Sequence, residues 1–452
     1  MKIPSPVFAT ALVLFLFVVP ANSEQTFTAP QLRADLAQLR LALRDMPADL
    51  AHSADVPKLN AALDALDGKL ANSAPLTRDE AWREFATLNP LLADGHLFIG
   101  FVDWRGDTRA LLATGGALFP FDVDVTAGCD LVAHPEPDSS WTFPEAGAPI
   151  RVINSVPSRE VCEQLMARVH GETPAFRADL LSRRFWFFYW KTFGAPANYE
   201  LAFDAGIKSY PGRTAVPRLL GDEQVFERQF EIYSLGDKTK KSVDTAVLKL
   251  GTFAWPDKDR VLAFTQQQFE LLNRWHVKNL VIDLTDNGGG NDDQWIEGVM
   301  PYVATKRWRV ASTYRKRVVS PDAAKHEVTG AVVDGDVDTW YGAHPENPLR
   351  FRGSIYVLVG PGTYSSAVLF ANVMQDFGFA KLAGTGDAVR ADQSGGTRRT
   401  TLTNTGLIFV SPRFVLRRPS GKTTPIYLTP TIDLTGTPKE RMAAKLGERV
   451  GK

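Results

Sequence analysis

The chain has 452 residues, enough for two or three domains of about 150 residues each. Apolar residues make up 44% and charged residues 23%, which is ordinary for a globular protein. The 51 basic residues are matched by 51 acidic ones, which argues against a protein that works mainly by binding nucleic acid or an anionic membrane surface. The sequence has neither a Cys/His zinc spacing nor an HExxH-type helix, so we expect no metal ion and no other cofactor.

The first residues resemble an export signal. Lys2 gives a positive start, residues 7–19 form a short apolar core, and residues 21–23 form a small-x-small cleavage site. The pattern predicts a signal peptide over residues 1–23 and an exported protein, periplasmic or extracellular. An uncleaved anchor is the alternative. No later apolar stretch is long enough to cross a bilayer, so we expect no stable membrane span after cleavage.

Residues 28–92 have the apolar periodicity of helices. Leucines recur at helical spacing in two runs, Leu32, Leu36, Leu39 and Leu43, then Leu59, Leu63, Leu66 and Leu70. Thr77 and Glu80 form a capping box ahead of a third apolar run. These patterns predict an N-terminal helical unit over residues 24–104.

An Asp-Gly-His turn, residues 94–96, comes before an apolar run that resembles a strand, residues 97–102. A turn-to-strand junction is a good place to present the His96 imidazole to a cleft. A lone histidine is also commonly a hydrogen-bonded structural residue, and the turn by itself leaves both interpretations open.

Residues 105–215 form a second region with strands, a helix and an aromatic run. Residues 118–125 alternate, residues 147–157 resemble a strand and turn, and the aromatic run 185–190 is typical of a core or domain interface. Cys129 and Cys162 also fall here. In an oxidising compartment they would pair, but two buried free thiols fit the spacing equally well.

From residue 216 the pattern changes to alternating strands and helices. Residues 246–253, 280–284 and 355–359 are expected strands, with helices between and after them. This alternation predicts an α/β core whose strands end on a common edge. Residues 311–350 are polar and irregular, which suggests a loop or flap. A charged helix is expected over residues 439–449.

Two of the expected strands run into glycine-rich turns and then helices. Gly288, Gly289 and Gly290 follow the first, a turn suited to close approach of the backbone to a substrate. A serine-rich turn containing Ser365 follows the second. A hydroxyl on a tight turn between a buried strand and a buried helix is well placed for a nucleophile. A plain helix cap is the alternative for this serine.

Three motifs then stand in one order along the chain: residues 94–96, residues 280–290 and residues 362–367. Together they resemble the serine peptidase family that contains the C-terminal processing proteases, the tricorn core proteases and the retinoid-binding repeats. The resemblance implies an α/β (α+β) fold with a crotonase/ClpP-like peptidase core over residues 216–452. It also implies a PDZ-like domain over residues 105–215, of which residues 147–166 resemble the second half.

That family has two catalytic layouts. In one, a lysine 25 positions after the serine is the base, and Arg390 occupies that position here. Arginine cannot serve as a base because its pKa lies above about 12. The tricorn-like layout uses a histidine well before the glycine turn, and His96 matches it. An imidazole with a pKa near ~6.5 can accept a serine proton at neutral pH.

Carried over to this chain, the resemblance implies Ser365 as nucleophile and His96 as general base and then acid. It implies an oxyanion hole from the amide of Ser366 and that of Gly288 or Gly289. Tricorn-like members orient the histidine through a serine and a glutamate in the C-terminal strands. No glutamate stands near residues 423–426, so the expected orienting acids are Asp433, Asp392 or Asp387, unless that member is missing.

These inferences predict an exported serine endopeptidase that acts on a peptide or protein substrate through an acyl-enzyme on Ser365. The PDZ-like region would dock an extended chain by strand addition. Two alternatives remain: a non-catalytic ligand- or peptide-binding protein on the same scaffold, which the missing glutamate favours, and another hydrolase such as an esterase.

Overall fold

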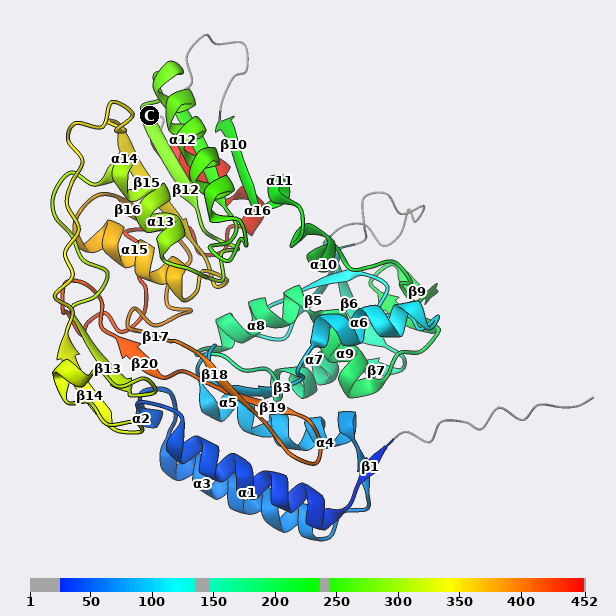
Figure 1. Cartoon of the computed structure of the whole chain (residues 1–452). Coiled ribbons are helices and arrows are strands. Elements are labelled where there is room, and N and C mark those ends of the chain that lie inside the picture. The colour runs from blue at the N-terminus through cyan, green and yellow to red at the C-terminus, as the bar shows by residue number, and fades with distance from the viewer. Residues whose placement is uncertain (1–24, 135–146, 236–243, 451–452) are drawn as a thin grey trace, which may run out of the picture.

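The computed structural model describes residues 25–134, 147–235 and 244–450 (Figure 1). The predicted signal peptide, residues 1–23, lies outside the described residues. Among the helices of the described ranges, none combines the length and apolarity that a bilayer span requires.

The C-terminal half of the chain, from residue 216 on, is built on a six-stranded sheet in the order β10-β11-β12-β15-β16-β21. Only β10 runs antiparallel to its neighbour; the other pairs are parallel. The strands are β10 (Phe230–Leu235), β11 (Thr245–Leu250), β12 (Asn279–Asp283), β15 (Ser354–Val359), β16 (Lys381–Gly384) and β21 (Ile432–Asp433). The nearly continuous apolar sequence of the central strands β11, β12 and β15 is that of strands buried on both faces.

Helices cover both faces of this sheet (Figure 1). Alternate residues of the strands point to opposite sides, so Leu280 packs in the same core as Phe269, and Val281 in the same core as Leu446. The helices of this half are α10 (Arg218–Asp222), α11 (Phe226–Gln229), α12 (Lys258–Arg274), α13 (Asp293–Gly298), α14 (Met300–Val303), α15 (Ser366–Asp376) and α16 (Lys439–Val450).

The helices predicted near the N-terminus are present, and the leucines of both runs are buried. They are α1 (Ala29–Asp45), α2 (Leu50–Ser53), α3 (Val56–Ala71), α4 (Arg78–Phe85) and α5 (Asn89–Leu92), with a 3-10 turn η1 (Ala86–Leu88) and the short pair β1 (Thr26–Phe27) and β2 (Leu76–Thr77). The predicted capping box of Thr77 and Glu80 opens α4.

This unit is tied to the far end of the chain. β3 (Phe98–Gly100) completes a three-stranded sheet with β18 (Arg398–Thr401) and β19 (Ile408–Ser411). The buried Asp35 of α1 accepts hydrogen bonds from the backbone of Asn404 and Thr405 in the turn between β18 and β19. The two ends of the chain therefore fold together, which brings early residues to the late strands.

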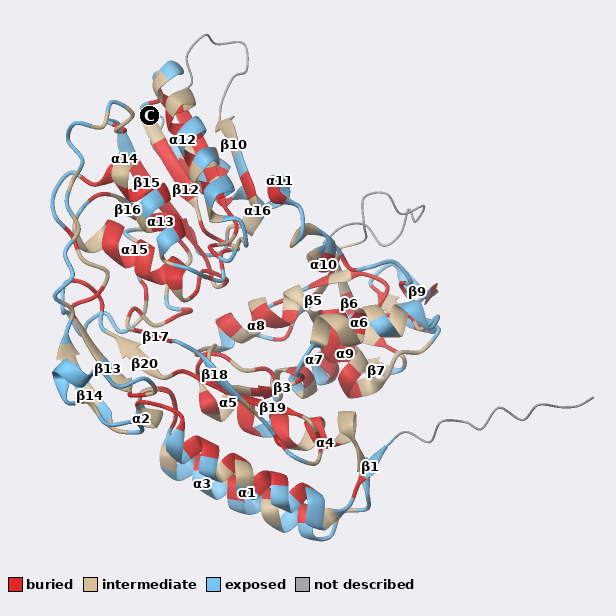
Figure 2. Ribbon diagram, in the orientation of Figure 1, coloured by how far each residue is buried: buried red, intermediate tan, exposed pale blue. Residues whose placement is uncertain are grey.

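The middle region has its own antiparallel sheet, β4-β5-β6-β8-β9, with β7 paired to β6. Its strands are β4 (Asp122–Val125), β5 (Leu131–His134), β6 (Ala148–Ile153), β7 (Val156–Pro157), β8 (Asn198–Phe203) and β9 (Gly206–Pro211); its helices are α6 (Trp104–Ala113), α7 (Ser158–Met166), α8 (Pro174–Arg183) and α9 (Phe185–Phe193). The aromatic run lies in α9, which is mostly buried (Figure 2).

The structure decides the cysteine question, because Cys129 and Cys162 form a disulfide between the β4–β5 turn and α7. The likeness of this region to a PDZ domain, and the boundaries at 104 and 215, stay predictions.

The polar segment 311–350 differs from its prediction as a loop or flap. It contains β13 (Thr313–Arg317), a 3-10 turn η2 (Ala323–Lys325) and β14 (Val332–Asp336), which pair in a sheet of order β14-β13-β20-β17. The other strands of that sheet are β20 (Phe414–Leu416) and β17 (Gln393–Gly395). Neither β13 nor β14 has a fully buried residue, so this part of the sheet, the β13–β14 ribbon, carries little of the apolar alternation by which strands are identified from sequence.

Candidate functional site

The glycine turn and the serine turn meet at one edge of the large sheet. β12 and β15 are parallel neighbours, with Asp283 paired to Leu358, so the turns that follow them lie side by side. The amide of Tyr364 donates to the carbonyl of Asn287 at 2.9 Å. A methyl group built on Gly289 would lie 2.7 Å from Cβ of Ser365. Only a glycine lets the two turns approach this closely.

Of the three serine and threonine hydroxyls on the serine turn, two are engaged in structure. Thr363 donates to the carbonyl of Leu284, and buried Ser366 donates to Asp292 and accepts from the indole of Trp295. The third, on half-buried Ser365, has no hydrogen-bond partner among the described residues. Ser365 is the N-cap residue of α15, but its side chain makes no capping hydrogen bond, so the helix-cap alternative has no hydrogen bond to support it.

Ser365 stands on a strained backbone. Its φ is 55° and ψ is −124°, in the left-handed half of conformational space that side-chain-bearing residues rarely adopt. Its amide donates to Oε1 of Gln393 at 2.9 Å, which helps to hold this conformation. Ser365 holds this conformation at the end of the turn, and α15 begins at the next residue, Ser366.

Two backbone amides near Ser365 are left without protein acceptors in the described ranges, those of Ser366 and Gly288. Ser366 is the first residue of α15, where amides have no partner within the helix. The amide of Gly289, in contrast, donates to Oδ1 of Asn287 at 2.8 Å. Of the two glycines expected to supply an oxyanion amide, Gly288 is free to do so, and Gly289 supplies room for Ser365.

His96 sits in the turn before β3, where its ring packs on Tyr364 with centroids 4.8 Å apart. Its Nδ1 lies 3.0 Å from the hydroxyl of Ser394 on β17, and that hydroxyl lies 2.9 Å from Oδ1 of Asp94. Its Nε2 has no hydrogen-bond partner within the part of the chain that the structure describes. The imidazole is thus held on one side only.

The hydrogen bonds around Asp94 fix the tautomer of His96. Asp94 is fully buried and accepts from the hydroxyls of Ser53, Tyr364 and Ser394 and from the amide of His96. Because Ser394 donates its proton to Asp94, it accepts from His96, so Nδ1 of the ring carries the hydrogen. Nε2 is then the unprotonated nitrogen, which is the state that a general base needs.

Burial lowers the pKa of His96, while the nearby charge of Asp94 acts in the opposite direction. The ring is therefore neutral at pH 7. Burial acts to raise the pKa of Asp94, but the interaction with His96 and the donated hydrogen bonds outweigh it and keep that pKa low. Asp94 is the ionised member of the set.

The structure brings His96 and Ser365 into one neighbourhood without joining them. Tyr364 precedes Ser365 and packs on His96; Gln393 holds the amide of Ser365 while the next residue, Ser394, holds His96. No hydrogen bond links His96 to the hydroxyl of Ser365 in the described structure. Gly289 of the glycine turn lies against the same serine.

Comparison with known proteins finds a family-model match over the part of the chain that carries both turns. Residues 244–434, which include both turns, match the family model described as peptidase family S41. The chain carries an S41 domain, that of a serine-type peptidase. No curated protein matches the sequence.

Solved structures are similar to this chain over most of its length, including the residues outside the S41 match. Mature CPAF complexed with lactacystin is 15% identical with a TM-score of 0.63, over 93% of this chain and 96% of that one. A CPAF mutant is 13% identical with a TM-score of 0.65, over 92% and 95%. At these identities the likeness shows the fold. The mixed α/β fold predicted from the sequence is confirmed.

The three aspartates expected to orient the histidine lie elsewhere around the S41 domain. Asp433 accepts from the amide of Thr435. Asp387 accepts from the hydroxyl of Thr429, and Asp392 from the amide of Arg418. None of them is hydrogen-bonded to His96 in the described chain. The acid that stands behind the histidine is Asp94, two residues before it, through Ser394.

The sequence interpretation missed Asp94 as the orienting acid, as well as Ser394 and Glu172. The Asp-Gly-His turn itself contained Asp94, but only the fold shows that its carboxylate points back toward the ring. Glu172, two residues before α8, lies 3.2 Å from the hydroxyl of Tyr364 and accepts from the amide of Arg390. Arg390, which occupies the lysine position of the other layout, donates from its side chain to the carbonyl of Ala93 at 2.8 Å.

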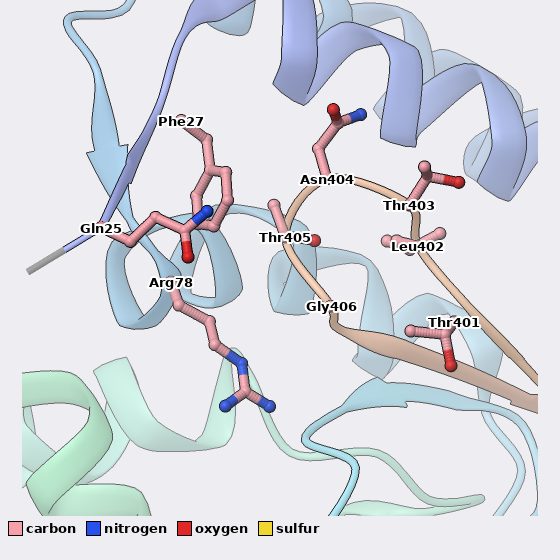
Figure 3. A pocket seen from close by; sticks show the side chains of 9 residues that line it. All are labelled: Gln25, Phe27, Arg78, Thr401, Leu402, Thr403, Asn404, Thr405 and Gly406. Carbon is pink, nitrogen blue, oxygen red and sulfur yellow. The ribbon is translucent and has the colours of Figure 1, made fainter.

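Two cavities differ in their relation to the S41 site. One of about 550 Å³ lies beside it, lined by Asp49, His52, Thr313, Tyr314, Arg315, Asp334, Gly335, Asp336, Asp392, Val415 and Arg417. The other, of about 590 Å³, lies between β1, α4 and the turn after β18 (Figure 3). Neither lining contains Ser365 or His96. The first cavity includes His52 and Asp392, which are next in sequence to Ser53 and Gln393 of the candidate site, so it lies nearer to that site than the second cavity does.

Proposed function

We propose that this S41 peptidase hydrolyses peptide bonds through an acyl-enzyme on Ser365, with His96 as general base and then general acid. One observation carries the proposal. The chain from Asp94 through Ser394 fixes hydrogen on Nδ1 of His96, which leaves Nε2 open, while the hydroxyl of Ser365 is the one on its turn without a partner.

Each of these residues has a role in one step of acyl transfer. Ser365 Oγ attacks the carbonyl carbon as its proton passes to Nε2 of His96. The oxyanion is met by the amides of Gly288 and Ser366, each worth about 3 kcal/mol in such sites. The imidazolium charge is stabilised by Asp94 through Ser394, and the proton then goes to the leaving amine. Water repeats the sequence to release the acyl group.

The proposal requires His96 and Ser365 to come into hydrogen-bond contact when substrate binds. Catalytic hydrogen bonds are often long in the free enzyme and tighten in the substrate complex. The rings of His96 and Tyr364 are tilted by 43° with no hydrogen bond between them, and the only hydrogen bond of the imidazole in the described residues is the one at Nδ1. The proposal requires the ring to turn about this anchor until Nε2 reaches the hydroxyl of Ser365.

Export is also part of the proposal. The apolar start of the sequence supports it, and so does the disulfide between Cys129 and Cys162, because disulfides persist in oxidising compartments. The substrate would be a protein or an extended peptide. β9 is the last strand of the middle sheet and is mostly exposed, including Ile207, so it offers an edge to which an extended chain can add.

Labelling with a fluorophosphonate probe tests the mechanism. We expect covalent labelling of the wild-type protein, its loss in Ser365→Ala and a strong decrease in His96→Ala. Ser420→Ala, which removes an exposed hydroxyl from a turn of the same half, is the matched control and should label as the wild type does. Labelling that persists in Ser365→Ala would refute the role of that serine.

A binding protein on the same scaffold is the second candidate, favoured by the missing hydrogen bond between His96 and Ser365. It predicts no labelling of the folded wild-type protein and unchanged peptide binding in His96→Ala. An esterase would label in the same way as a peptidase, and a panel of ester and peptide substrates separates those two.

A further inference from the structure

The hydroxyl of Tyr364 is the point where the catalytic turns meet the middle region. It accepts from the amide of Gly95 at 3.0 Å. It also lies 3.0 Å from Oδ1 of Asp94 and 3.2 Å from Oε1 of Glu172. A phenol has one proton to give, so it cannot donate to two carboxylates at once. One of the two acids must carry a proton of its own.

Counting donors decides which acid that is. Asp94 receives hydrogen bonds from three other groups, namely the hydroxyls of Ser53 and Ser394 and the amide of His96. Glu172 receives one, from the amide of Arg390, on its other oxygen. The acid with many donors is stabilised as the anion, and the acid with few is stabilised as the neutral form. The proton therefore sits on Oε1 of Glu172, facing Tyr364.

We propose that Glu172 is a positioning residue that acts as a neutral carboxylic acid. It donates to Tyr364, so that Tyr364 donates to Asp94 and holds the chain from Asp94 through Ser394 to His96. The inference rests on the proposed function, because the part it positions is the proposed base. It adds a proton donor that lies just before α8, outside the S41 match.

The surroundings of Glu172 support the neutral form. The titratable and charged groups that act on its carboxyl are Asp94, Tyr364 and Arg390, and His170 and Arg177 are near it in the chain. Burial and the negative charge of Asp94 raise the pKa of Glu172 to about 8, against the opposing effect of Arg390. The guanidinium of Arg390 is occupied at the carbonyl of Ala93, and that of Arg177 at the carbonyl of Gly171.

His170 does not supply a compensating charge either. Its ring is stacked on Phe98 at 4.1 Å, and burial lowers its pKa to about 3. It is neutral whenever the protein works near neutral pH. Glu172 thus has no cation paired with its carboxyl side chain among the described residues, and an anion there would be poorly stabilised.

Ionisation of Glu172 would reverse the hydrogen bond of Tyr364. A new carboxylate 3.2 Å from the phenol competes with Asp94 for its proton. Asp94 would lose one of its donors and face a second negative charge. Because Tyr364 packs on His96 and precedes Ser365, the base and the nucleophile would both be disturbed. Activity should fall as the pH rises through the pKa of Glu172.

The closing experiment follows the rate of fluorophosphonate labelling between pH 7 and pH 9 in the full-length mature protein. With a pKa of about 8, the neutral form falls about tenfold over this range, and the wild-type rate should fall with it after correction for probe hydrolysis. Glu172→Gln, which keeps a donor toward Tyr364 and cannot ionise, should lose this decrease. Glu163→Gln, an exposed change on α7, should keep the wild-type profile.

A second readout does not depend on activity. The infrared carbonyl band of a protonated carboxylic acid should be present in the wild type at pH 7, weaken toward pH 9 and be absent from Glu172→Gln. Without such a band, or with a band that Glu172→Gln does not remove, the inference is wrong whether or not the protein labels.

The two proposals fail in different ways. If the band is present but the folded wild type does not label, the proposed function fails and the proton on Glu172 stands. If the wild type labels and Glu172→Gln shows the same alkaline decrease, the positioning role is overturned. A Glu172→Gln rate at pH 7 as low as that of a Glu172→Ala variant would also overturn it, because the active form would then be the carboxylate.

Discussion

The two halves of the candidate site are built in different ways. The nucleophile edge, which we define as residues 284–290 and 360–366, follows two neighbouring parallel strands, and its main contacts join adjacent turns. The histidine arm, defined as residues 94–96 with their side-chain partners, depends on contacts with Ser53, Glu172, Tyr364 and Ser394, at sequence separations that reach 300 residues. A sheet fixes the first, and long-range hydrogen bonds fix the second.

The two halves should therefore respond differently to substitution. The nucleophile edge is rigid because strands and α15 hold it from both sides, so changes there should act through lost atoms or lost room. The histidine arm is a chain of hydrogen bonds that contains two buried acids, so changes there should act through protons. The following predictions separate these two kinds of effect.

Removing the nucleophile should have the largest effect. Ser365→Ala is expected to lower kcat by a factor on the order of 10⁵ to 10⁶, as loss of the nucleophile does in serine proteases. Fold and stability should change little, because the hydroxyl has no partner in the described structure to lose. Steady-state hydrolysis of a labelled protein substrate measures it; a fall of only tenfold would contradict the assignment.

Asp94→Asn tests the histidine arm against the earlier sequence interpretation. It should lower kcat by about 10³ to 10⁴, because an amide at this place no longer fixes the tautomer of His96. Asp392→Asn is the matched control, since Asp392 was an expected orienting acid but binds the amide of Arg418. Equal losses in the two variants would show that the arm is wrongly assigned.

A pair of glycine variants tests the room at the nucleophile edge. Gly289→Ala should lower kcat by about 10² or more, the cost typical of displacing a reacting group by about 1 Å. The new Cβ would meet Ser365 and the amide of Ser366, and the φ of Gly289 is 96°. In Gly288→Ala the methyl meets nothing within 4 Å, and the amide remains. The alanine at 288 should therefore cost far less than the alanine at 289.

The proton on Glu172 should make the free energy of unfolding depend on pH. Its pKa of about 8 lies above the ordinary glutamate value of 4.5, so the unfolded chain ionises first and wild-type stability falls as pH rises from 4.5 to 8. Glu172→Gln does not titrate. Relative to wild type, its free energy of unfolding should rise between pH 5 and pH 8 by an amount on the order of 2–3 kcal/mol. Urea denaturation at the two pH values measures this difference.

The smallest expected effect is a shift in the acid-side midpoint of the pH profile of kcat/KM. Burial lowers the pKa of His96 below 6.5, its ordinary value, so the base stays neutral into mildly acid solution. The midpoint of kcat/KM on the acid side should lie below 6.5. The stability that this histidine provides as a neutral ring is present above 6.5 and is lost as the pH falls toward the lowered pKa. A midpoint above 6.5 would mean that Asp94 outweighs burial.

Much of the nucleophile edge could be predicted from sequence because its signals are local. Apolar strands, glycines and a serine before a helix stand next to one another in the chain, and the parallel arrangement of β12 and β15 follows from alternating strands and helices. The N-terminal helices were predicted for the same reason, since Leu32 to Leu43 repeat within one element. The β13–β14 ribbon was missed because it is exposed and has little apolar periodicity.

The sequence by itself determined the alternation that makes the α/β core, the two turns at its edge and the presence of a histidine in an early turn. Only the tertiary structure decided which acid stands behind that histidine, that Ser394 carries the link, and that Glu172 reaches Tyr364 from the bend before α8. The physical reason is that helix and strand patterns are properties of neighbouring residues. A hydrogen bond between Asp94 and Ser394 exists only after β3 has paired with β19 and the two ends of the chain have met.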